Sequence, residues 1–419
     1  MDIQITPSPL HGTVLVPPSK SASHRAVICA ALSRGTCRIA PVSFSKDIEA
    51  PLSCARALGA QIQRETGAVR ITGIGNTPQA AALDCEESGS TLRFFLPIAA
   101  ALGIPASFSG KGKLPARPLE PLTAQMRAHG VCFSPAPALP FSISGRLTPG
   151  RFSLAGNVSS QFITGLLFAL PLLEGDSEIL LTSPLESAGY VDMTLEMLRH
   201  FGIRIFPTEH GWTVPGGQAY RPTDITVEAD YSNAAFWLAA GALGDGLNVQ
   251  GLRESSTQGD REILSLLRRF GALICPGENG IFVSGLSLRG IIIDAAQIPD
   301  LVPILAVLAA YSEGKTMIQN AGRLRLKECD RLAAVSDLLA RLGAQVEERP
   351  DSLVICGSPS LPGGATVDGW GDHRIVMSAA IAALLCERPI TITGAQAVQK
   401  SYPSFFEDFQ ALGGICHVL

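Results

Sequence analysis

The chain has few charged residues and no long hydrophobic run. Charged residues make up 17% of its 419 residues and hydrophobic residues 46%, which excludes a mainly disordered protein. Its longest apolar stretches, residues 301–311 and 377–386, fall well short of the about 18 residues that indicate a membrane-spanning helix. The start, MDIQITPSPL, lacks the basic end and apolar stretch of a signal peptide. We expect a soluble, cytoplasmic protein that does not bind membranes.

The chain also lacks an excess of positive charge and any pairing of its metal-binding side chains. Its formal net charge is −4, so no overall basic field is present to hold a nucleic-acid backbone. The ten cysteines include no C-x-x-C pair, and the seven histidines include no H-x-x-x-H pair. Zinc and redox sites usually need such spacing. We therefore expect buried, reduced thiols, no protein-bound metal and no nucleic-acid partner.

One phrase recurs six times: a helical stretch, a large apolar residue, a glycine and a short β-type run. The glycines are spaced by 69 to 72 residues, and His129 replaces the apolar residue once. Glycine suits the end of a helix where the chain turns through a left-handed conformation into a strand. The repeated glycines are Gly59, Gly130, Gly202, Gly271, Gly343 and Gly413. We read them as the ends of six amphipathic helices in an internal repeat.

A second phrase keeps the same spacing and predicts six strongly apolar, buried helices. Each has a polar or glycine-containing start followed by an almost uninterrupted apolar run. The copies span residues 19–32, 87–102, 157–170, 229–243, 297–310 and 371–385. With the β-type runs between them, the repeat predicts an α/β protein, most simply of two domains with three units each. A single continuous solenoid is the alternative, although solenoid units usually have 20–50 residues.

The starts of these buried helices combine hydroxyls with cations. A helix N-terminus offers unpaired N–H groups and a partial positive charge, and so suits an anion. Lys20, Ser21 and Arg25 lie at the first start, and Arg93 lies one turn into the second. Ser, Thr and Asp also cap ordinary helices, but capping does not explain cations in the first turn. Both readings stay open for any single start.

Further cations precede or begin the second helix of several repeats. They are Arg117, Lys327, Arg331 and Lys400. Lys327 and Arg331 form an i,i+4 pair of like charge, which is mildly destabilising unless an anion lies between them. A solvated helix face is the alternative for each cation. Taken together, the cations suggest one highly anionic small ligand, or two. Asp300 opens an apolar helix and is either an N-cap or a general base.

The sequence resembles the 5-enolpyruvylshikimate-3-phosphate synthase family from residue 5 to the C-terminus. The segments that carry the resemblance are PPSKSASHRA, SGSTLR, LPARPL, VSSQF, VEADYSNAAFWLAA, IPD, LKECDRL, GDHR and QKSYPSFF. It implies the α/β two-domain enolpyruvyl transferase fold of six βαβαββ repeats, three per domain. One domain would comprise residues 1–18 and 229–419 and the other residues 19–228, with the active site in the cleft between them.

The resemblance also implies the reaction and the site. The family transfers the enolpyruvyl group of phosphoenolpyruvate to the 5-hydroxyl of shikimate 3-phosphate in the shikimate pathway of aromatic amino-acid biosynthesis, and releases phosphate. It needs no metal or other cofactor, and we expect a monomer. Shikimate 3-phosphate would meet Lys20, Ser21, Arg25, Ser159, Ser160, Gln161, Ser183, Asp300, Arg323 and Lys327. Phosphoenolpyruvate would meet Lys20, Gly89, Arg117, Gln161, Arg331, Arg374 and Lys400. The catalytic residues would be Asp300, Glu328 and Lys20.

Two departures and two alternatives accompany this interpretation. The segment around Ser183 and Tyr190 is longer than the usual Ser-Lys-Pro-Tyr form, and Arg323 stands where Asn is also common. The related enolpyruvyl transferase that acts on UDP-N-acetylglucosamine has a catalytic cysteine before its Ala-Arg-Pro segment, whereas the loop here reads SGKGKLPARP. A non-catalytic anion-binding protein of the same fold would be expected to lose its catalytic groups.

Overall fold

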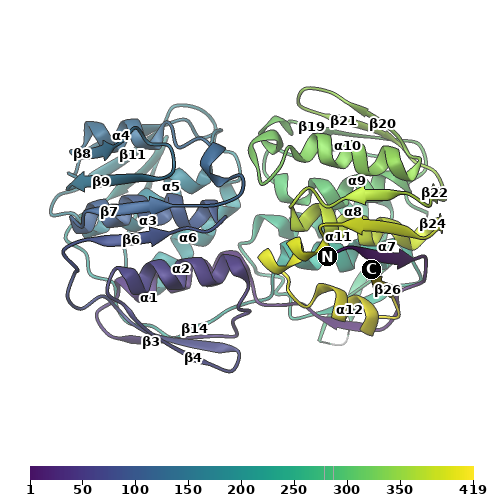
Figure 1. Ribbon diagram of the computed structural model, residues 1–419, viewed down its shortest axis with the longest axis horizontal. Coiled ribbons are helices and arrows are strands. Elements are labelled where there is room, and N and C mark those ends of the chain that lie inside the picture. Colours follow the sequence, from purple (N-terminus) through teal and green to yellow (C-terminus); the bar gives the residue numbers. More distant parts are fainter. Residues whose placement is uncertain (278, 286) are drawn as a thin grey trace. The chain divides into compact units, whose positions relative to one another are not determined.

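The chain forms two compact units, each with its own hydrophobic core. The computed structural model describes residues 1–277, 279–285 and 287–419. Unit 1 comprises Met1–Pro17 and Glu228–Leu419, and unit 2 comprises Pro18–Val227 (Figure 1). The core of unit 1 includes Trp237, whose ring stacks on Phe405 with centroids 4.9 Å apart. The core of unit 2 includes Phe94 and Phe168.

Within the described residues, six four-stranded sheets share one pattern of strand order and direction. The first two strands are parallel, and the third and fourth are added antiparallel. The pattern is shown by β10 (Arg151–Leu154), β11 (Ser177–Leu181), β13 (Gly211–Val214) and β12 (Phe206–Thr208), in that order. In four of the six sheets a buried helix connects the two parallel strands, as α5 (Ser160–Ala169) does here, and in the other two sheets the parallel strands come from distant parts of the chain.

The other sheets of unit 2 have the same pattern. One consists of β14 (Ile225–Thr226), β3 (Thr36–Ala40), β5 (Ala68–Thr72) and β4 (Gln61–Glu65). The next consists of β6 (Ala81–Asp84), β7 (Ala106–Ser109), β9 (Phe141–Gly145) and β8 (Val131–Ser134). Strand β14 comes from the end of the unit 2 segment and pairs with β3 near its start, with Ile225 opposite Ile39. This pairing closes the unit on itself.

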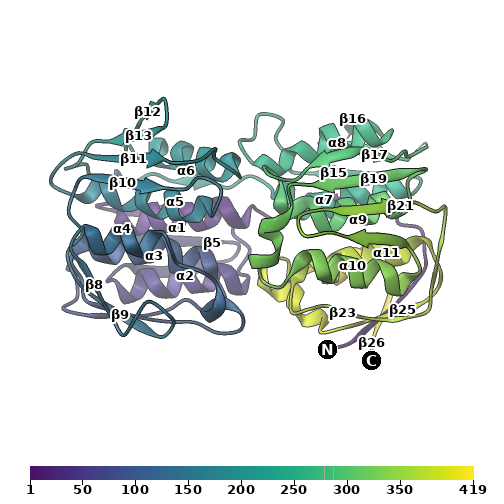
Figure 2. The same ribbon diagram turned by 90° about the horizontal axis from the view of Figure 1, so that it is seen from above.

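Unit 1 contains three such sheets and a short two-stranded one. The first consists of β2 (Thr13–Leu15), β15 (Leu247–Gln250), β17 (Gly280–Ser284) and β16 (Leu273–Gly277). The second consists of β18 (Ile292–Asp294), β19 (Lys315–Gln319), β21 (Leu353–Cys356) and β20 (Gln345–Glu348). The third consists of β23 (Thr366–Asp368), β25 (Ile390–Thr393), β1 (Ile3–Thr6) and β26 (Ile415–Val418), and the short one of β22 (Leu361–Gly363) and β24 (Cys386–Arg388). Because β1 pairs with β26, the two termini lie close together (Figures 1 and 2).

The six predicted buried helices are confirmed. They are α1 (Lys20–Leu32), α3 (Gly89–Leu102), α5 (Ser160–Ala169), α7 (Tyr231–Leu243), α9 (Val302–Ala310) and α11 (His373–Ala382). Every residue of α9 is buried, as its unbroken apolar sequence predicts. Several candidate site residues stand at the starts of these helices, among them Lys20, Gly89, Ser160 and Arg374.

The six amphipathic helices that end before the repeated glycines are also confirmed. They are α2 (Lys46–Ala57), α4 (Leu122–Ala128), α6 (Ala188–His200), α8 (Ile263–Phe270), α10 (Arg331–Leu342) and α12 (Phe405–Ala411). All six repeated glycines have a positive φ, between 78° and 106°. The left-handed turn into the next strand is therefore present at each, as the glycine spacing predicts.

Two composition-based expectations have clear outcomes in the described residues. No helix there combines the length and the apolar character needed to cross a membrane. All ten cysteines are free thiols, and seven are buried. The prediction of buried thiols is wrong for Cys132, which is exposed because its side chain points outward from the edge strand β8.

Candidate active site

Helix α1 of unit 2 begins with Lys20, as predicted, and holds a cationic group. The Lys20 Nζ lies 2.8 Å from the Asp47 Oδ2 of α2. Arg25, one turn into the helix, is only 3% exposed. Its NH1 donates to the Ser21 carbonyl oxygen at 2.9 Å, so these predicted neighbours do lie on one face. The structure thus brings together Lys20, Ser21 and Arg25 at the start of α1.

Arg25 is anchored by neutral oxygens of α6. Its Nε donates to the Thr194 Oγ1 at 2.8 Å, and its NH2 donates to the Tyr190 carbonyl oxygen at 2.7 Å. Burial lowers the pKa of Arg25 to about 10, which still leaves the guanidinium charged at neutral pH. A desolvated cation held by neutral oxygens keeps its full positive charge available for an anionic ligand.

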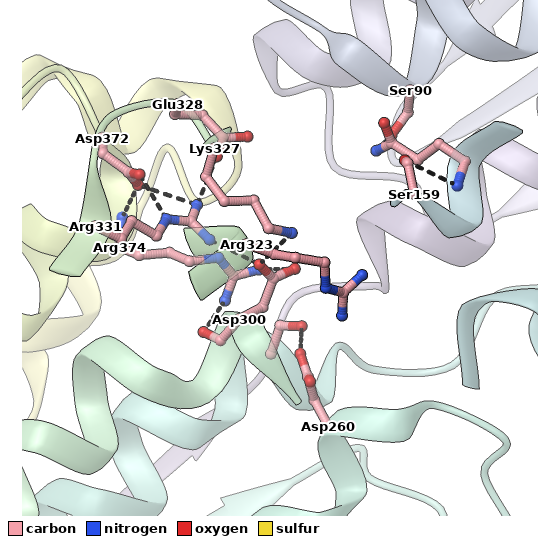
Figure 3. Close-up of polar contacts among 12 residues, drawn as sticks. Ser90, Ser159, Asp260, Asp300, Arg323, Lys327, Glu328, Arg331, Asp372 and Arg374 are labelled. Carbon is pink, nitrogen blue, oxygen red and sulfur yellow. Dashed lines mark hydrogen bonds and ion pairs between the residues drawn. The ribbon is translucent and has the colours of Figure 1, made fainter. Parts of the chain in front are cut away.

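The starts of α3 and α5 form a second group in unit 2. Ser159 caps α5 by accepting from the Gln161 N–H at 3.3 Å. The Gln161 side chain then reaches α3, because its Oε1 accepts from Arg93 NH1 at 2.6 Å and its Nε2 donates to Ser90 Oγ at 2.9 Å. Figure 3 labels Ser90 and Ser159 in this group. Ser160 is buried in the first turn of α5. Gln161 therefore connects two helix starts.

Two arginine side chains lie over the first residue of α3. A Cβ built on Gly89 would be 2.7 Å from Arg117 NH1 and 2.9 Å from Arg93 NH1. Contacts this close exclude any side chain at Gly89 unless both guanidinium groups move. Arg117 follows the short 3-10 helix η1 (Leu114–Ala116). A glycine at this position thus lets two cations approach a helix N-terminus, where N–H groups also favour an anion.

Ser183 lies apart from these contacts. Its Oγ donates to Asn157 Oδ1 at 2.9 Å and accepts from the Asn157 N–H at 3.3 Å. Asn157 precedes α5 in sequence, and so Ser183 fixes the loop that leads into that helix. Ser183 therefore stabilises the loop conformation before α5 through Asn157.

In unit 1, Arg331 lies at the centre of a group of carboxylates (Figure 3). Its side chain is 1% exposed and donates to three acids. The partners are Asp300 Oδ1 at 2.7 Å, Glu328 Oε2 at 2.8 Å and Asp372 Oδ2 at 2.7 Å. Burial opposes the charge, but Asp372, Glu328 and Asp300 outweigh it and raise the pKa of Arg331 well above its usual value.

Asp300 accepts from more than one cation. Lys327 Nζ lies 3.3 Å from its Oδ1, and Arg374 NH2 lies 3.5 Å from its Oδ2. Arg374 NH1 also donates to the Asp300 carbonyl oxygen at 3.0 Å. With Arg331, three cations thus converge on one carboxylate. The side chain is 14% exposed.

Two sequence interpretations are corrected here. Asp300 is not an N-cap: it lies within the 3-10 helix η4 (Pro299–Leu301), and neither η4 nor α9 has a side-chain cap. Lys327 and Arg331 are not an i,i+4 pair within one helix. Lys327 is extended, at the end of η5 (Gly322–Leu326), and α10 begins only at Arg331. The anion expected between these two cations is the carboxylate of Asp300.

Sequence reasoning missed two buried acids in unit 1. Asp372 is fully buried, caps α11 by accepting from the Arg374 N–H at 2.9 Å, and holds Arg331. Burial alone would raise its pKa, but Arg331 reverses the direction and lowers it. Its N-cap position was visible in the sequence, whereas its contact with Arg331, 41 residues away, was not.

The second missed acid is Asp260, in the 3-10 helix η3 (Gly259–Glu262). Its carboxylate is 4% exposed and accepts a hydrogen bond from the Ser232 hydroxyl of α7 (Figure 3). Burial, and then the negative charge of Asp300, raise the pKa of Asp260 to about 6. Because it stands in the polar segment STQGDREI, no pattern distinguished it from a surface acid.

The remaining predicted cations of unit 1 donate to backbone carbonyls. Arg323 NH2 donates to the Ala296 oxygen at 2.8 Å. Lys400 ends the 3-10 helix η7 (Ala395–Lys400), and its Nζ donates to the Gly371 oxygen at 2.7 Å. Gly371 directly precedes Asp372, so Lys400 lies beside the start of α11. In residues 1–277, 279–285 and 287–419, no three His, Cys, Asp or Glu side chains are grouped as metal ligands.

Comparison with solved structures defines the class of fold. The chain aligns over 100% of its length with 100% of EPSP synthase from Acinetobacter baumannii, at 28% identity and a TM-score of 0.83. It also aligns over 99% of its length with 98% of the enolpyruvyl transferase NikO from Streptomyces tendae, at 21% identity and a TM-score of 0.80. The second likeness concerns the fold alone. The fold is therefore that of the enolpyruvyl transferases, as the sequence predicts.

Sequence comparison then gives the family. Residues 5–409 match the model of EPSP synthase (3-phosphoshikimate 1-carboxyvinyltransferase). A 3-phosphoshikimate 1-carboxyvinyltransferase of Clostridium kluyveri is 46% identical over 415 residues, which cover 98% of this chain and 97% of that protein. One of Clostridioides difficile is 45% identical over 426 residues, with the same coverage. The chain belongs to the EPSP synthase family of transferases, which confirms the resemblance seen in its motifs.

Proposed function

We propose that the helix starts of unit 2 and the acid-rich cluster of unit 1 together bind the substrates of the EPSP synthase reaction. The chain, a member of this family, transfers the enolpyruvyl group of phosphoenolpyruvate to the 5-hydroxyl of shikimate 3-phosphate and releases phosphate. The observation that carries the proposal is the convergence of three cations on Asp300: the buried Arg331 and Arg374, and the half-buried Lys327. Such a carboxylate can accept a proton while the cations around it hold anions.

Units 1 and 2 would be the two domains of the transferase, predicted as residues 1–18 with 229–419 and as residues 19–228. Shikimate 3-phosphate would bind to residues of both. From unit 2 these are Lys20, Ser21, Arg25, Ser159, Ser160, Gln161 and Ser183, and from unit 1 they are Asp300, Arg323 and Lys327. The support is chemical: the α1 and α5 starts present N–H groups, hydroxyls and the charged Arg25, which suit a phosphate.

Phosphoenolpyruvate would bind next to this substrate. Its proposed partners are Lys20, Gly89, Arg117, Gln161, Arg331, Arg374 and Lys400. Two observations support the assignment. Arg117 lies over the bare N-terminus at Gly89, and Lys400 lies beside the start of α11, whose first turn carries Arg374. Phosphate and carboxylate groups are well matched to guanidinium donors, which contact two oxygens at once.

The proposed chemistry is addition followed by elimination. Asp300 takes the proton of the 5-hydroxyl as its oxygen bonds to C2 of phosphoenolpyruvate, while C3 gains a proton. The resulting tetrahedral intermediate then loses a proton from C3 and expels phosphate. Glu328, with Lys20 or Lys400 nearby, would give and remove the proton at C3. Glu328 is held by Arg331, so its carboxylate has a fixed place beside Asp300. The monomeric state and cytoplasmic location stay predictions.

The test is phosphate release from phosphoenolpyruvate with three acceptors in parallel: shikimate 3-phosphate, UDP-N-acetylglucosamine and none. We expect one phosphate per shikimate 3-phosphate consumed and none in the other two reactions. Release only with the UDP-sugar would favour the related transferase. Binding of both anions without release would favour a non-catalytic protein. Either result contradicts the proposed function.

A further inference from the structure

Ser88 stands at a point where two hydrogen bonds converge on one hydroxyl oxygen. It is the N-cap of α3 and is 5% exposed. Its Oγ accepts from the Thr91 N–H at 3.2 Å, which is ordinary N-capping. It also accepts from the Thr91 hydroxyl at 2.8 Å. Both contacts use Ser88 as an acceptor, and so neither uses its own hydroxyl hydrogen.

The hydroxyl of Thr91 is in turn connected to His24 of α1. Thr91 has a single hydroxyl hydrogen and gives it to Ser88. The 3.1 Å contact between Thr91 Oγ1 and His24 Nε2 must therefore have His24 as the donor. Burial, together with Arg25 and Lys20, holds the pKa of His24 well below its usual value, so the ring is neutral and its one N–H is at Nε2. A directed series of donors thus leads from His24 through Thr91 to Ser88.

In this series of hydrogen bonds, the hydroxyl hydrogen of Ser88 is the one that is not donated to another residue. Within residues 1–277, 279–285 and 287–419, the structure shows no acceptor for the hydroxyl hydrogen of Ser88. A buried donor that stays unpaired costs free energy, so an acceptor is expected. The hydroxyl is also polarised, because each hydrogen bond that it accepts makes it a better donor. Ser88 is therefore set up to donate to a group that the chain itself does not supply.

The surroundings of Ser88 indicate the chemistry of that group. The next residue, Gly89, has Arg117 and Arg93 above it, at 2.7 and 2.9 Å from the position of a Cβ. The first turn of α3 adds its own N–H groups and the positive end of its dipole. Cations, helix N–H groups and a hydroxyl donor all favour an oxyanion.

We propose that the Ser88 hydroxyl donates a hydrogen bond to a phosphate or carboxylate oxygen of phosphoenolpyruvate, and that His24 and Thr91 orient it. The ligand's identity rests on the proposed function. Ser88 is thus a further substrate-binding residue, beside Gly89 and Arg117. His24 and Thr91 are positioning residues, because they act through Ser88 and not on the ligand.

The test separates this contact from the N-cap. Ser88→Gly removes the hydroxyl but costs a cap only a few tenths of a kcal/mol, whereas Ser88→Ala removes both the hydroxyl and the cap. Dissociation constants for phosphoenolpyruvate and for shikimate 3-phosphate, together with melting temperatures, would be measured for both variants and the parent. We expect both variants to weaken phosphoenolpyruvate by about tenfold or more. Shikimate 3-phosphate should change by less than about twofold, and only Ser88→Ala should melt clearly lower.

Thr91→Val gives a graded check, because it removes the donor behind Ser88 but leaves the Ser88 hydroxyl in place. It should weaken phosphoenolpyruvate by less than Ser88→Gly does. The proposal is overturned if Ser88→Gly binds phosphoenolpyruvate within about twofold of the parent, or if it weakens both substrates equally. These results are distinct from a failure of the proposed function, in which the parent itself would release no phosphate with shikimate 3-phosphate.

Discussion

Arg25 in unit 2 and Arg331 in unit 1 are both buried, at 3% and 1% exposure, but their charged groups have different hydrogen-bond partners. Arg25 donates to a hydroxyl and two carbonyl oxygens. Arg331 donates to three carboxylates. As a consequence, burial lowers the pKa of Arg25 to about 10. The pKa of Arg331 is instead raised well above its usual value, because the acids outweigh the effect of burial.

We propose that the two regions have different tasks because of this difference. Neutral partners leave the charge of Arg25 uncompensated, so the α1 start is ready to attract and hold an anion. Carboxylate partners balance the charge of Arg331, which in turn holds Asp300 and Glu328 in fixed positions. On this account unit 2 mainly supplies charge for binding, and unit 1 mainly supplies the carboxylates for proton transfer. Each prediction below tests one side of this contrast.

The largest expected effect comes from removing the two arginines. Arg331→Met leaves buried carboxylates without their shared cation, and should lower the free energy of unfolding by about 3–5 kcal/mol. Arg25→Met leaves only neutral oxygens behind and should cost about 1–2 kcal/mol. Denaturant unfolding of both variants beside the parent measures the difference. Equal losses would show that the acids around Arg331 do not set its energetics.

A second prediction concerns Asp260, whose pKa is raised to about 6 in the folded protein from an ordinary value of 3.8. A raised pKa means that the folded state binds the proton more tightly. The stabilisation is thus complete below about pH 3 and is lost as the pH rises through 6. The difference between these two pKa values corresponds to about 3 kcal/mol. The Asp260→Asn variant does not lose this stability as the pH rises, because Asn does not ionise.

The free energy of unfolding of Asp260→Asn, relative to the parent, should therefore rise by about 2.5 kcal/mol between pH 4 and pH 7. Unfolding at several pH values measures it. Asp245→Asn, at an exposed position, is the matched control and should follow the parent's pH profile. A constant difference between Asp260→Asn and the parent across this range would contradict the prediction.

A third, smaller effect is expected for two cations at the proposed phosphoenolpyruvate site. Arg117→Ala and Lys400→Ala should each cost about 1.5–3 kcal/mol of phosphoenolpyruvate binding, or about 10- to 150-fold in affinity, and less of shikimate 3-phosphate binding. Titration of each substrate separates the two. Lys315→Ala, on an exposed position of β19, controls for the loss of a charge alone. Equal weakening of both substrates would mean that the subsites are misassigned.

Local signals in the sequence were sufficient for the elements of the fold. The repeated glycines marked helix ends because a left-handed turn there needs glycine, and all six have a positive φ. The apolar runs marked buried helices because a helix that is apolar on every face has to be enclosed. Both signals depend only on neighbouring residues. The motif order then sufficed for the family.

The site's internal contacts depend on pairings that no local signal reports. Asp300 looked like an N-cap, but a 3-10 helix precedes α9, and its carboxylate meets cations instead. The contact of Asp372 with Arg331 and the burial of Asp260 arise only when α10, α11 and η3 pack in the folded chain. The hydrogen bond from His24 to Thr91 joins residues 67 positions apart. Sequence predicted which residues carry charge, but not which charges meet.

The most direct test of the contrast is the turnover of Asp300→Asn with shikimate 3-phosphate and phosphoenolpyruvate. Asp300 caps neither helix, so the substitution probes its carboxylate and not a cap. The account predicts that kcat falls by about a hundredfold or more, because the general base is lost. The dissociation constants of both substrates should stay within about threefold of the parent. A variant that keeps kcat within about threefold would contradict the account, and Glu328 would then become the candidate base.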